Sequence, residues 1–252
     1  MVVGAGDIAD CSPGAETTAK QLDSMSGTIF ALGDNDYVNG VDAYKCYHAT
    51  WGRHRGRTRP TPGNHEYETP GATPYFTYFG ASAGPAGLGY YSFTLGDWLV
   101  VSLNSNVSAG SDSAQGKWLG QTLAASQARC TLAFWHHPRF SSGKNGQNPH
   151  MQDLWRMLYA AGAELVLSGH DHHYERFAPI DDEGALDEKR GLRQFIAGTG
   201  GAPLRQPASI AAHSEARISE FGVVKLTLGR EGYGWEFLGT SGPQDSGFAG
   251  CH

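Results

Sequence analysis

Five short loops of this sequence carry residues that can bind metal ions. They read Gly6-Asp7-Ile8-Ala9, Gly33-Asp34-Asn35-Asp36-Tyr37, Gly63-Asn64-His65-Glu66, His136-His137-Pro138 and Gly169-His170-Asp171-His172. Carboxylate, amide and phenol oxygens suit hard ions, and imidazole suits borderline divalent ions. In four of the loops a glycine precedes the first of these residues, which lets the backbone turn sharply. A single loop of this kind is an ordinary turn, but the ordered set indicates a metal centre.

Each loop follows a short apolar run that is typical of a buried strand. We expect strands at about 2–6, 28–32, 58–62, 131–135 and 164–168, and helices at about 15–25, 41–51, 113–127 and 150–161. Continuous apolar strands between helices predict an α/β layered sheet. Because sites in such sheets form at the carboxyl ends of the strands, the five loops should meet there.

The rest of the chain adds β structure and loops. Segments 89–95 and 98–103 predict a hairpin, and residues 192–197, 222–228 and 233–238 look like strands of a second sheet. The Gly198-Thr199-Gly200-Gly201 segment lacks the lysine and the following helix of a phosphate-binding P-loop, so we expect a turn that lines the rim of the site. No repeat or linker is visible, which favours one domain over residues 1–252.

Composition argues against two classes of protein. The net charge of −6 makes a nucleic-acid-binding surface improbable, and no apolar run approaches the roughly 18 residues of a membrane span.

Cysteine usage indicates the compartment. The four cysteines are far apart, which predicts two disulfides in an oxidising environment and not a zinc knuckle. Of the three pairings we favour Cys11–Cys46 with Cys130–Cys251; four buried thiols are the alternative. Met1 directly precedes an apolar run, so we expect that a leader has been removed and that the protein is secreted, periplasmic or extracellular.

The five loops resemble the motifs of the calcineurin-like metallophosphoesterase superfamily, which are D-x-H or GD, then GD, GNH, H and GHxH in that order. Tyr37, three residues after Asp34, and the run from Gly169 through Tyr174-Glu175-Arg176 are similar to the purple acid phosphatases and their bacterial secreted relatives. The resemblance covers residues 3 to about 200. It implies an α/β fold in the form of a four-layer αββα sandwich with two facing mixed β-sheets.

One departure from the superfamily pattern supports the narrower resemblance. Members of the superfamily carry a histidine two residues after the first aspartate, where this chain has Ala9, which cannot bind metal. The purple acid phosphatases share that loss and supply a tyrosine phenolate. The gain of Tyr37 is therefore consistent with the loss at Ala9, and an ordinary packed aromatic is the alternative for Tyr37.

The resemblance implies two metal ions. The residues that would bind them are Asp7, Tyr37, His172 and the shared Asp34 for the first ion, and Asp34, Asn64, His136 and His170 for the second. Carboxylates and a phenolate suit Fe(III), whereas an amide and two imidazoles suit a divalent ion such as zinc, iron or manganese. Such a pair would hold a bridging hydroxide that attacks phosphorus. The expected substrate is a small phosphate ester, with inorganic phosphate as product.

Three further histidines are candidates for contact with substrate. His65 resembles the family histidine that contacts the phosphoryl group. His150 resembles, at a different spacing, a second family histidine that binds substrate or acts as an acid; the alternative is a residue that only starts a helix. His137 adjoins a ligand and could point toward or away from the site. Each ligand imidazole also needs an acceptor for its second nitrogen, and the sequence offers Asp36 and Glu66 only as neighbours along the chain.

Three functions remain open from the sequence alone. The first is a phosphomonoesterase of the acid phosphatase type, and the second is a phosphodiesterase with the same metal centre. They would differ in the outer pocket, which we assign to loops 67–90, 104–116, 139–149 and 201–215. The third, a non-catalytic metal-containing binding protein, is disfavoured because every ligand position is filled.

Overall fold

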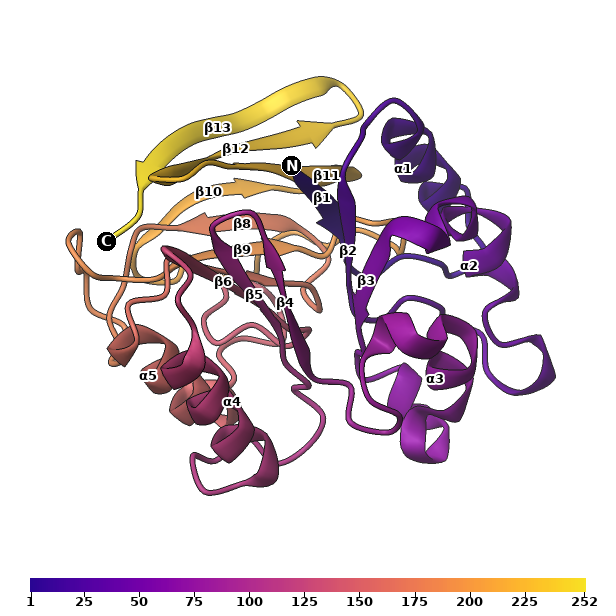
Figure 1. Cartoon of the computed structure of the whole chain (residues 1–252). Coiled ribbons are helices and arrows are strands. Elements are labelled where there is room, and N and C mark those ends of the chain that lie inside the picture. The colour runs from indigo at the N-terminus through magenta and orange to yellow at the C-terminus, as the bar shows by residue number, and fades with distance from the viewer.

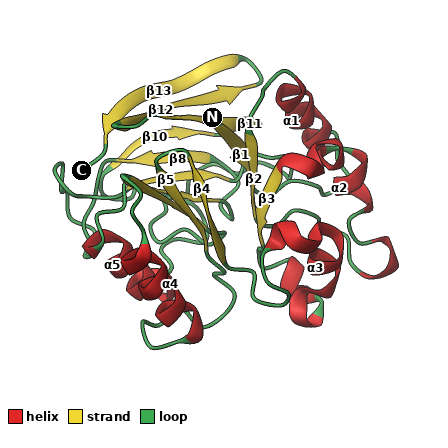
Figure 2. Cartoon of the chain, viewed as in Figure 1, coloured by secondary structure: helices red, strands yellow, loops and turns green.

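Two β-sheets face each other, and helices cover their outer faces (Figures 1 and 2). The computed structural model describes all residues 1–252. The sheets have the strand orders β13-β12-β11-β1-β2-β3 and β10-β8-β9-β7-β6-β5-β4. The strands are β1 Val2–Ala5, β2 Thr28–Leu32, β3 Thr58–Thr61, β4 Tyr91–Leu95, β5 Trp98–Ser102, β6 Cys130–Phe134, β7 Leu165–Ser168, β8 Tyr174–Phe177, β9 Arg193–Ala197, β10 Ser214–Ile218, β11 Gly222–Leu228, β12 Gly232–Gly239 and β13 Gly242–Gly250.

The helices divide between the two outer faces (Figure 1). They are α1 Gly14–Asp23, α2 Lys45–Ala49, α3 Thr73–Phe79, α4 Ala114–Ala125 and α5 Gln152–Ala160. One apolar cluster fills the space between the sheets, a second lies between the seven-stranded sheet and α4 and α5, and a third lies between the six-stranded sheet and α1 to α3. The predicted four-layer αββα sandwich with two mixed sheets is confirmed.

Aromatic pairs join the two sheets across the central cluster. Phe30 of β2 stacks on Phe134 of β6 with ring centroids 4.5 Å apart, and Tyr174 of β8 stacks on Phe237 of β12 at 4.2 Å. All four side chains are buried. Since a well-placed aromatic pair adds about 0.5–1.5 kcal/mol beyond the area that it buries, these pairs help to fix how the sheets lie on each other.

The assignment of strands to sheets differs from the prediction. Segments 192–197, 222–228 and 233–238 do form strands, but they do not share a second sheet. β9 pairs in parallel with β7, whereas β11 pairs antiparallel with β1. The five strands before the metal-binding loops are likewise split between the sheets. An apolar run shows that a strand is buried but does not name its neighbour, so the sequence could not make this division.

Three strands were missed because their sequences have little strand character. β8 lies inside the run of the last metal-binding motif, and β10 contains few apolar residues. β13 is rich in glycine and polar residues and forms by antiparallel pairing along the whole of β12. Here a neighbouring strand, and not intrinsic propensity, decides the conformation.

The predicted helices exist, but the second is shorter than expected. Residues 41–51 contain only α2, with 3-10 turns at Gly40–Asp42 and Trp51–Arg57 on either side. Tyr44 has a φ of +68°, which is incompatible with a continuing helix. The sequence also failed to indicate α3, which is short and is bounded by Gly71 and Gly80 at positive φ.

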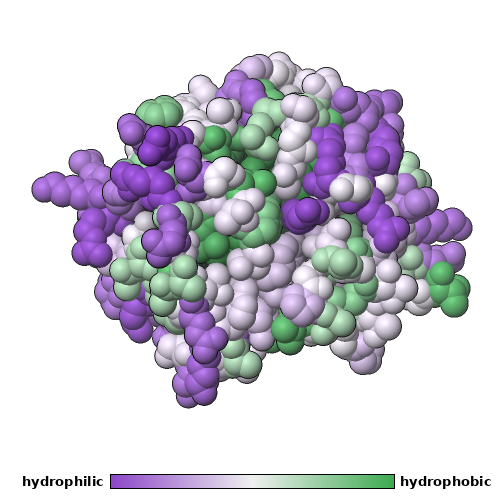
Figure 3. All heavy atoms as spheres, in the orientation of Figure 1, coloured by the Kyte–Doolittle hydropathy of each residue, from purple (hydrophilic) through white to green (hydrophobic).

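The two sheets end side by side at the edge strands β3 and β4. A pocket of about 430 Å³ lies there, lined in part by Arg59, Tyr91 and Phe93. Figure 3 shows apolar surface near the middle of this face, flanked by hydrophilic side chains. The guanidinium of Arg59 lies 5.6 Å from the centre of the Phe93 ring, and Pro60 lies within β3. A charge and a proline on an edge strand discourage pairing with another chain.

Both favoured disulfides are present. Cys11 is bonded to Cys46 and Cys130 to Cys251, with Cα–Cα distances of 5.2 and 5.9 Å. The alternative of four free thiols is therefore wrong. No helix of the structure is long and apolar enough to cross a membrane.

Candidate metal centre

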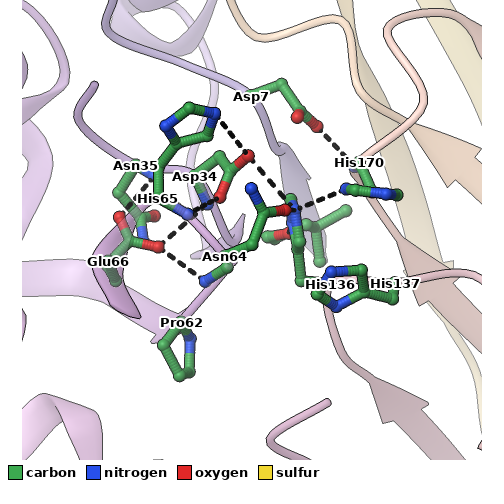
Figure 4. Close-up of polar contacts among 12 residues, drawn as sticks. Asp7, Asp34, Asn35, Pro62, Asn64, His65, Glu66, His136, His137 and His170 are labelled. Atoms are coloured by element: carbon green, nitrogen blue, oxygen red, sulfur yellow. Dashed lines mark hydrogen bonds and ion pairs between the residues drawn. The ribbon is translucent and has the colours of Figure 1, made fainter. Parts of the chain in front are cut away.

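The seven predicted ligands converge where the carboxyl ends of strands from both sheets meet. The loops after β1, β2 and β3 bring Asp7, Asp34, Tyr37 and Asn64 from the six-stranded sheet, and the loops after β6 and β7 bring His136, His170 and His172 from the other. Figure 4 shows side chains from these loops pointing toward one another. The site thus lies at the junction of the two sheets, which explains why its residues are so far apart in sequence.

The backbone at three of the predicted ligands is left-handed. Asp7, Asp34 and His170 have φ values of +58°, +48° and +71°. Such values are uncommon for residues other than glycine and concentrate at functional sites.

Close approach accounts for two glycines of the motifs. A Cβ on Gly63 would lie 2.1 Å from Oδ1 of Asp34, and a Cβ on Gly33 would lie 2.5 Å from Nδ1 of His136. Any side chain at either position would therefore displace a predicted ligand.

The first group of donor atoms comprises Asp7, Tyr37 and His172. Asp7 Oδ1 lies 3.2 Å from the Tyr37 hydroxyl and 3.3 Å from His172 Nε2. The Tyr37 hydroxyl and His172 Nε2 are 3.3 Å apart. These three atoms form a nearly equilateral triangle.

The second group comprises Asp34, Asn64, His136 and His170. His136 Nε2 lies 3.3 Å from Asp34 Oδ2, 3.2 Å from Asn64 Oδ1 and 3.2 Å from His170 Nδ1. A carboxylate oxygen of Asp7, one of Asp34 and a nitrogen of His136 all lie within 4.8 Å of one another, so the two groups adjoin.

The spacing of these atoms fits metal coordination. Bonds of about 2.1 Å place neighbouring ligands about 3.0 Å apart in an octahedron and about 3.4 Å apart in a tetrahedron. The observed separations of 3.2–3.3 Å fall between these values. The donor set therefore fits two adjacent cations in both chemistry and size.

Backbone carbonyls orient two of the imidazoles. Nδ1 of His136 lies 2.9 Å from the oxygen of Leu32, and Nδ1 of His172 lies 2.8 Å from the oxygen of Pro203. Because a carbonyl accepts the Nδ1–H, Nε2 of each ring is left to bind metal. Neither Asp36 nor Glu66 fills this role, so proximity in sequence was a poor guide.

Glu66 instead binds backbone N–H groups of two metal-binding loops. Its Oε1 accepts from Asn35 N at 2.8 Å and from the Tyr44 hydroxyl at 3.1 Å. Its Oε2 accepts from Asp34 N at 3.0 Å and from Gly63 N. Successive N–H groups that converge on an anion form a nest, and here the anion is a buried side chain (Figure 4). Burial, followed by the charge of Asp34, raises the pKa of Glu66 to about 7.

Electrostatics at the site favour cations. Burial opposes ionisation of Asp7, but hydrogen bonding and charge from His172, together with the charge of His136, hold the pKa of Asp7 below its usual value. Burial opposes charge on His136, yet Asp34 raises its pKa to about 9. Burial and then the two carboxylates raise the pKa of Tyr37. Negative charge thus accumulates where the donor atoms meet.

Of the three histidines predicted to contact substrate, His65 lies at the mouth of the site. Its side chain is 31% exposed, its Nδ1 lies 2.8 Å from Glu68, and its Nε2 lies 3.9 Å from Asp34 Oδ2. Its ring packs on Tyr37 with centroids 4.3 Å apart. The ring is therefore held beside both donor groups.

His137 packs on a predicted ligand, whereas His150 contacts none of them. The His137 ring lies 4.3 Å from that of His170, and its Nδ1 lies 2.8 Å from Ser105 Oγ. Burial, followed by the charges of His136 and His170, lowers the pKa of His137. His150 is exposed, its Nε2 lies 2.8 Å from the carbonyl oxygen of Val107, and it joins none of the ligand contacts.

The glycine-rich segment 198–201 lies behind the site and not on its rim. All four residues are buried. Gly200 N donates to the oxygen of Gly6, and a Cβ on Gly198 would lie 2.9 Å from Asp7 Oδ2. The segment supports the Asp7 loop, and its glycines are needed for this close approach.

Comparison with known proteins agrees with the geometry. The family model of the calcineurin-like phosphoesterases matches residues 1–174. The chain belongs to this family. It is 31% identical over 200 residues, 69% of its length, to the uncharacterized protein Rv2577 of Mycobacterium tuberculosis, of which it covers 35%. It is 29% identical over 238 residues, 84% of its length, to purple acid phosphatase 21 of Arabidopsis thaliana, of which it covers 53%.

A solved structure shows the same fold. Purple acid phosphatase PPD1 from yellow lupin aligns with a TM-score of 0.83 over 98% of this chain and 53% of that chain, at 20% identity. The chain thus spans 35% and 53% of the lengths of the two curated relatives named above. The resemblance to purple acid phosphatases expected from Tyr37 and the last motif is confirmed.

Proposed function

We propose that the protein is a phosphomonoesterase of the acid phosphatase type that works with two metal ions. The observation that carries this proposal is the pair of adjoining donor groups, within each of which the donor atoms are 3.2–3.3 Å apart. The first ion would be held by Asp7, Tyr37, His172 and Asp34, and the second by Asp34, Asn64, His136 and His170. The likeness to purple acid phosphatases supports a phosphate ester as substrate.

The chemistry of the two groups favours different ions. A phenol and two carboxylates suit a hard trivalent ion such as Fe(III), whereas an amide oxygen and two imidazoles suit divalent zinc, iron or manganese. When bound, such a pair supplies Lewis-acid activation of water and neutralises charge on the phosphoryl oxygens.

Three histidines outside the two donor groups would differ in their contact with the substrate. His65, held by Glu68 and packed on Tyr37, would contact the phosphoryl group from the mouth of the site. His137 would contact the substrate from the side of the second donor group, because its ring packs on that of His170. His150 would lie at the periphery, because its Nε2 is already hydrogen-bonded to the carbonyl oxygen of Val107. Inorganic phosphate is the expected product.

The two disulfides fit an oxidising environment. We therefore propose that the protein works in a secreted or periplasmic setting.

The test is a paired rate assay with p-nitrophenyl phosphate and bis-p-nitrophenyl phosphate from pH 4 to 10, with metal content measured on the same sample. Two ions per chain and faster turnover of the monoester are expected. Faster turnover of the diester would favour a phosphodiesterase with the same centre. Two bound ions without turnover of either ester would indicate a binding protein.

A further inference from the structure

Ser105, which lies in the loop after β5, contacts one of the histidines of the site through two hydrogen bonds. Its Oγ accepts the backbone N–H of His137 at 3.1 Å and lies 2.8 Å from Nδ1 of the same residue. Ser105 is 5% exposed, and its Oγ makes no other hydrogen bond. The Ser105 hydroxyl and the His137 imidazole are therefore hydrogen-bonded to each other.

The direction of this hydrogen bond follows from counting donors and acceptors. The Ser105 hydroxyl has one hydrogen to donate, and Nδ1 of His137 is the acceptor within reach. If Nδ1 carried a proton instead, the hydroxyl hydrogen would be buried without an acceptor, which is unfavourable. The Ser105 hydroxyl thus donates to Nδ1, and the proton of the neutral imidazole resides on Nε2.

The His137 ring lies beside the second donor group. A ring nitrogen of His137 lies within 4.8 Å of ring nitrogens of His136 and His170, both in the second donor group. The Trp135 indole N–H donates to the carbonyl oxygen of His137 at 2.8 Å, which fixes its backbone. Figure 4 shows His137 beside His136 and His170.

We propose that His137 is a catalytic residue that donates a hydrogen bond from Nε2–H to the phosphoryl group, and that Ser105 is a positioning residue that fixes its tautomer. This inference rests on the proposed phosphatase function. Donors aimed at the charge that develops on a reacting group stabilise the transition state more than the bound substrate. Loss of either residue should therefore lower kcat more than it changes KM.

A double-mutant cycle tests the coupling between the two residues. With p-nitrophenyl phosphate, His137→Ala should lower kcat about 100-fold, as loss of one oxyanion donor does, and Ser105→Ala about 10-fold, each with KM within about threefold. In the His137→Ala background, Ser105→Ala should change kcat less than about twofold, since the hydroxyl then has no imidazole to orient. Effects that multiply, or full activity of either single variant, would overturn the proposal.

Ser102→Ala provides the matched control. It deletes another buried hydroxyl three residues earlier, one that makes no hydrogen bond. Its kcat should equal that of the unmodified protein, and all variants should retain two ions and unfold at similar temperatures.

The tautomer can also be read without turnover. In zinc-loaded protein with ¹⁵N-labelled histidine, the His137 ring, identified by its absence from His137→Ala, should carry its proton on Nε2. Ser105→Ala should remove this preference. A proton on Nδ1 would overturn the inference whatever the activity. Absence of hydrolysis by the unmodified protein, with the proton on Nε2, would instead refute the proposed phosphatase function, and the catalytic role of His137 with it.

Discussion

Replacement of Glu66 by glutamine should weaken the fold and the site together. Oε1 of this buried carboxylate accepts from Asn35 N, the Tyr44 hydroxyl and, at 3.5 Å, Asp36 N, and Oε2 accepts from Asp34 N and Gly63 N. A glutamine has the same shape, but in either orientation its NH₂ group must face two backbone N–H donors, those of Asn35 and Asp36 or those of Asp34 and Gly63. The Tyr44 hydroxyl can turn to accept. The substitution therefore removes two hydrogen bonds to a charged acceptor and leaves two buried donors unpaired.

The expected loss can be estimated from these contacts. Two hydrogen bonds to a charged group contribute about 3–6 kcal/mol together. Removal of a buried charge offsets part of this, since burial raises the pKa of Glu66 to about 7. A net loss of about 2–4 kcal/mol remains, which for a chain of this length lowers Tm by about 5–15 °C. Because the contacts hold Asp34 at its strained φ of +48°, kcat should also fall at least about tenfold.

The assay is calorimetric unfolding at pH 8, with metal content and turnover measured on the same samples. Glu236→Gln is the matched control, because it removes a half-exposed carboxylate paired with Lys225 on the far strands of the sheet. That variant should unfold within about 2 °C of the unmodified protein, as expected for a surface ion pair. A Glu66→Gln protein with unchanged Tm and turnover would show that the carboxylate does not hold the loops.

Three further perturbations probe separate features of the molecule. Asn64→Ala should lower turnover about 100-fold and release the second ion while the unfolding temperature is retained, because the side chain supplies a donor atom to the site; rates and metal content report this. Tyr37→Phe should remove any visible absorption band of an iron-loaded sample, since the band requires phenolate bound to Fe(III); absorption spectra report this. Glu164→Gln should stabilise the protein at pH 8 but not at pH 4.5, because burial raises the pKa of Glu164 to about 7. A carboxyl whose pKa is higher in the folded state contributes stability below its unfolded pKa of about 4.5 and loses that contribution as the pH rises to about 7. The Tm of Glu164→Gln should therefore increasingly exceed that of the unmodified protein between pH 4.5 and 7.

Each of these three substitutions has its own contrary outcome, and the first two have a control variant. Gln244→Ala, on the exposed edge strand β13, should leave turnover unchanged, and near-normal rates in Asn64→Ala would remove that residue from the second ion. Tyr78→Phe should keep the absorption band, and a band that persists in Tyr37→Phe would place the chromophore elsewhere. A Tm difference for Glu164→Gln that is the same at both pH values would mean that its carboxyl titrates normally.

Much of the candidate site follows from short-range sequence signals. Glycine before Asp34 and Asn64, with an apolar run before each, marks a turn at a strand end, and this information is local. The absence of a histidine at Ala9 and the presence of Tyr37 can likewise be identified in the sequence alone. The disulfide pairing was favoured correctly, although the sequence left three pairings open.

The residues that could bind metal, most of the buried strands and helices, and the likeness to the family follow from the sequence alone. The pairing of β9 with β7 and of β11 with β1, the contacts of Glu66 with two loops and the hydrogen bond of Ser105 to His137 became known only from the folded chain. The difference lies in the range of the interactions. Propensity and apolar periodicity act between residues a few positions apart, whereas strand partners and buried hydrogen bonds join residues tens of positions apart and are set by packing of the whole sandwich.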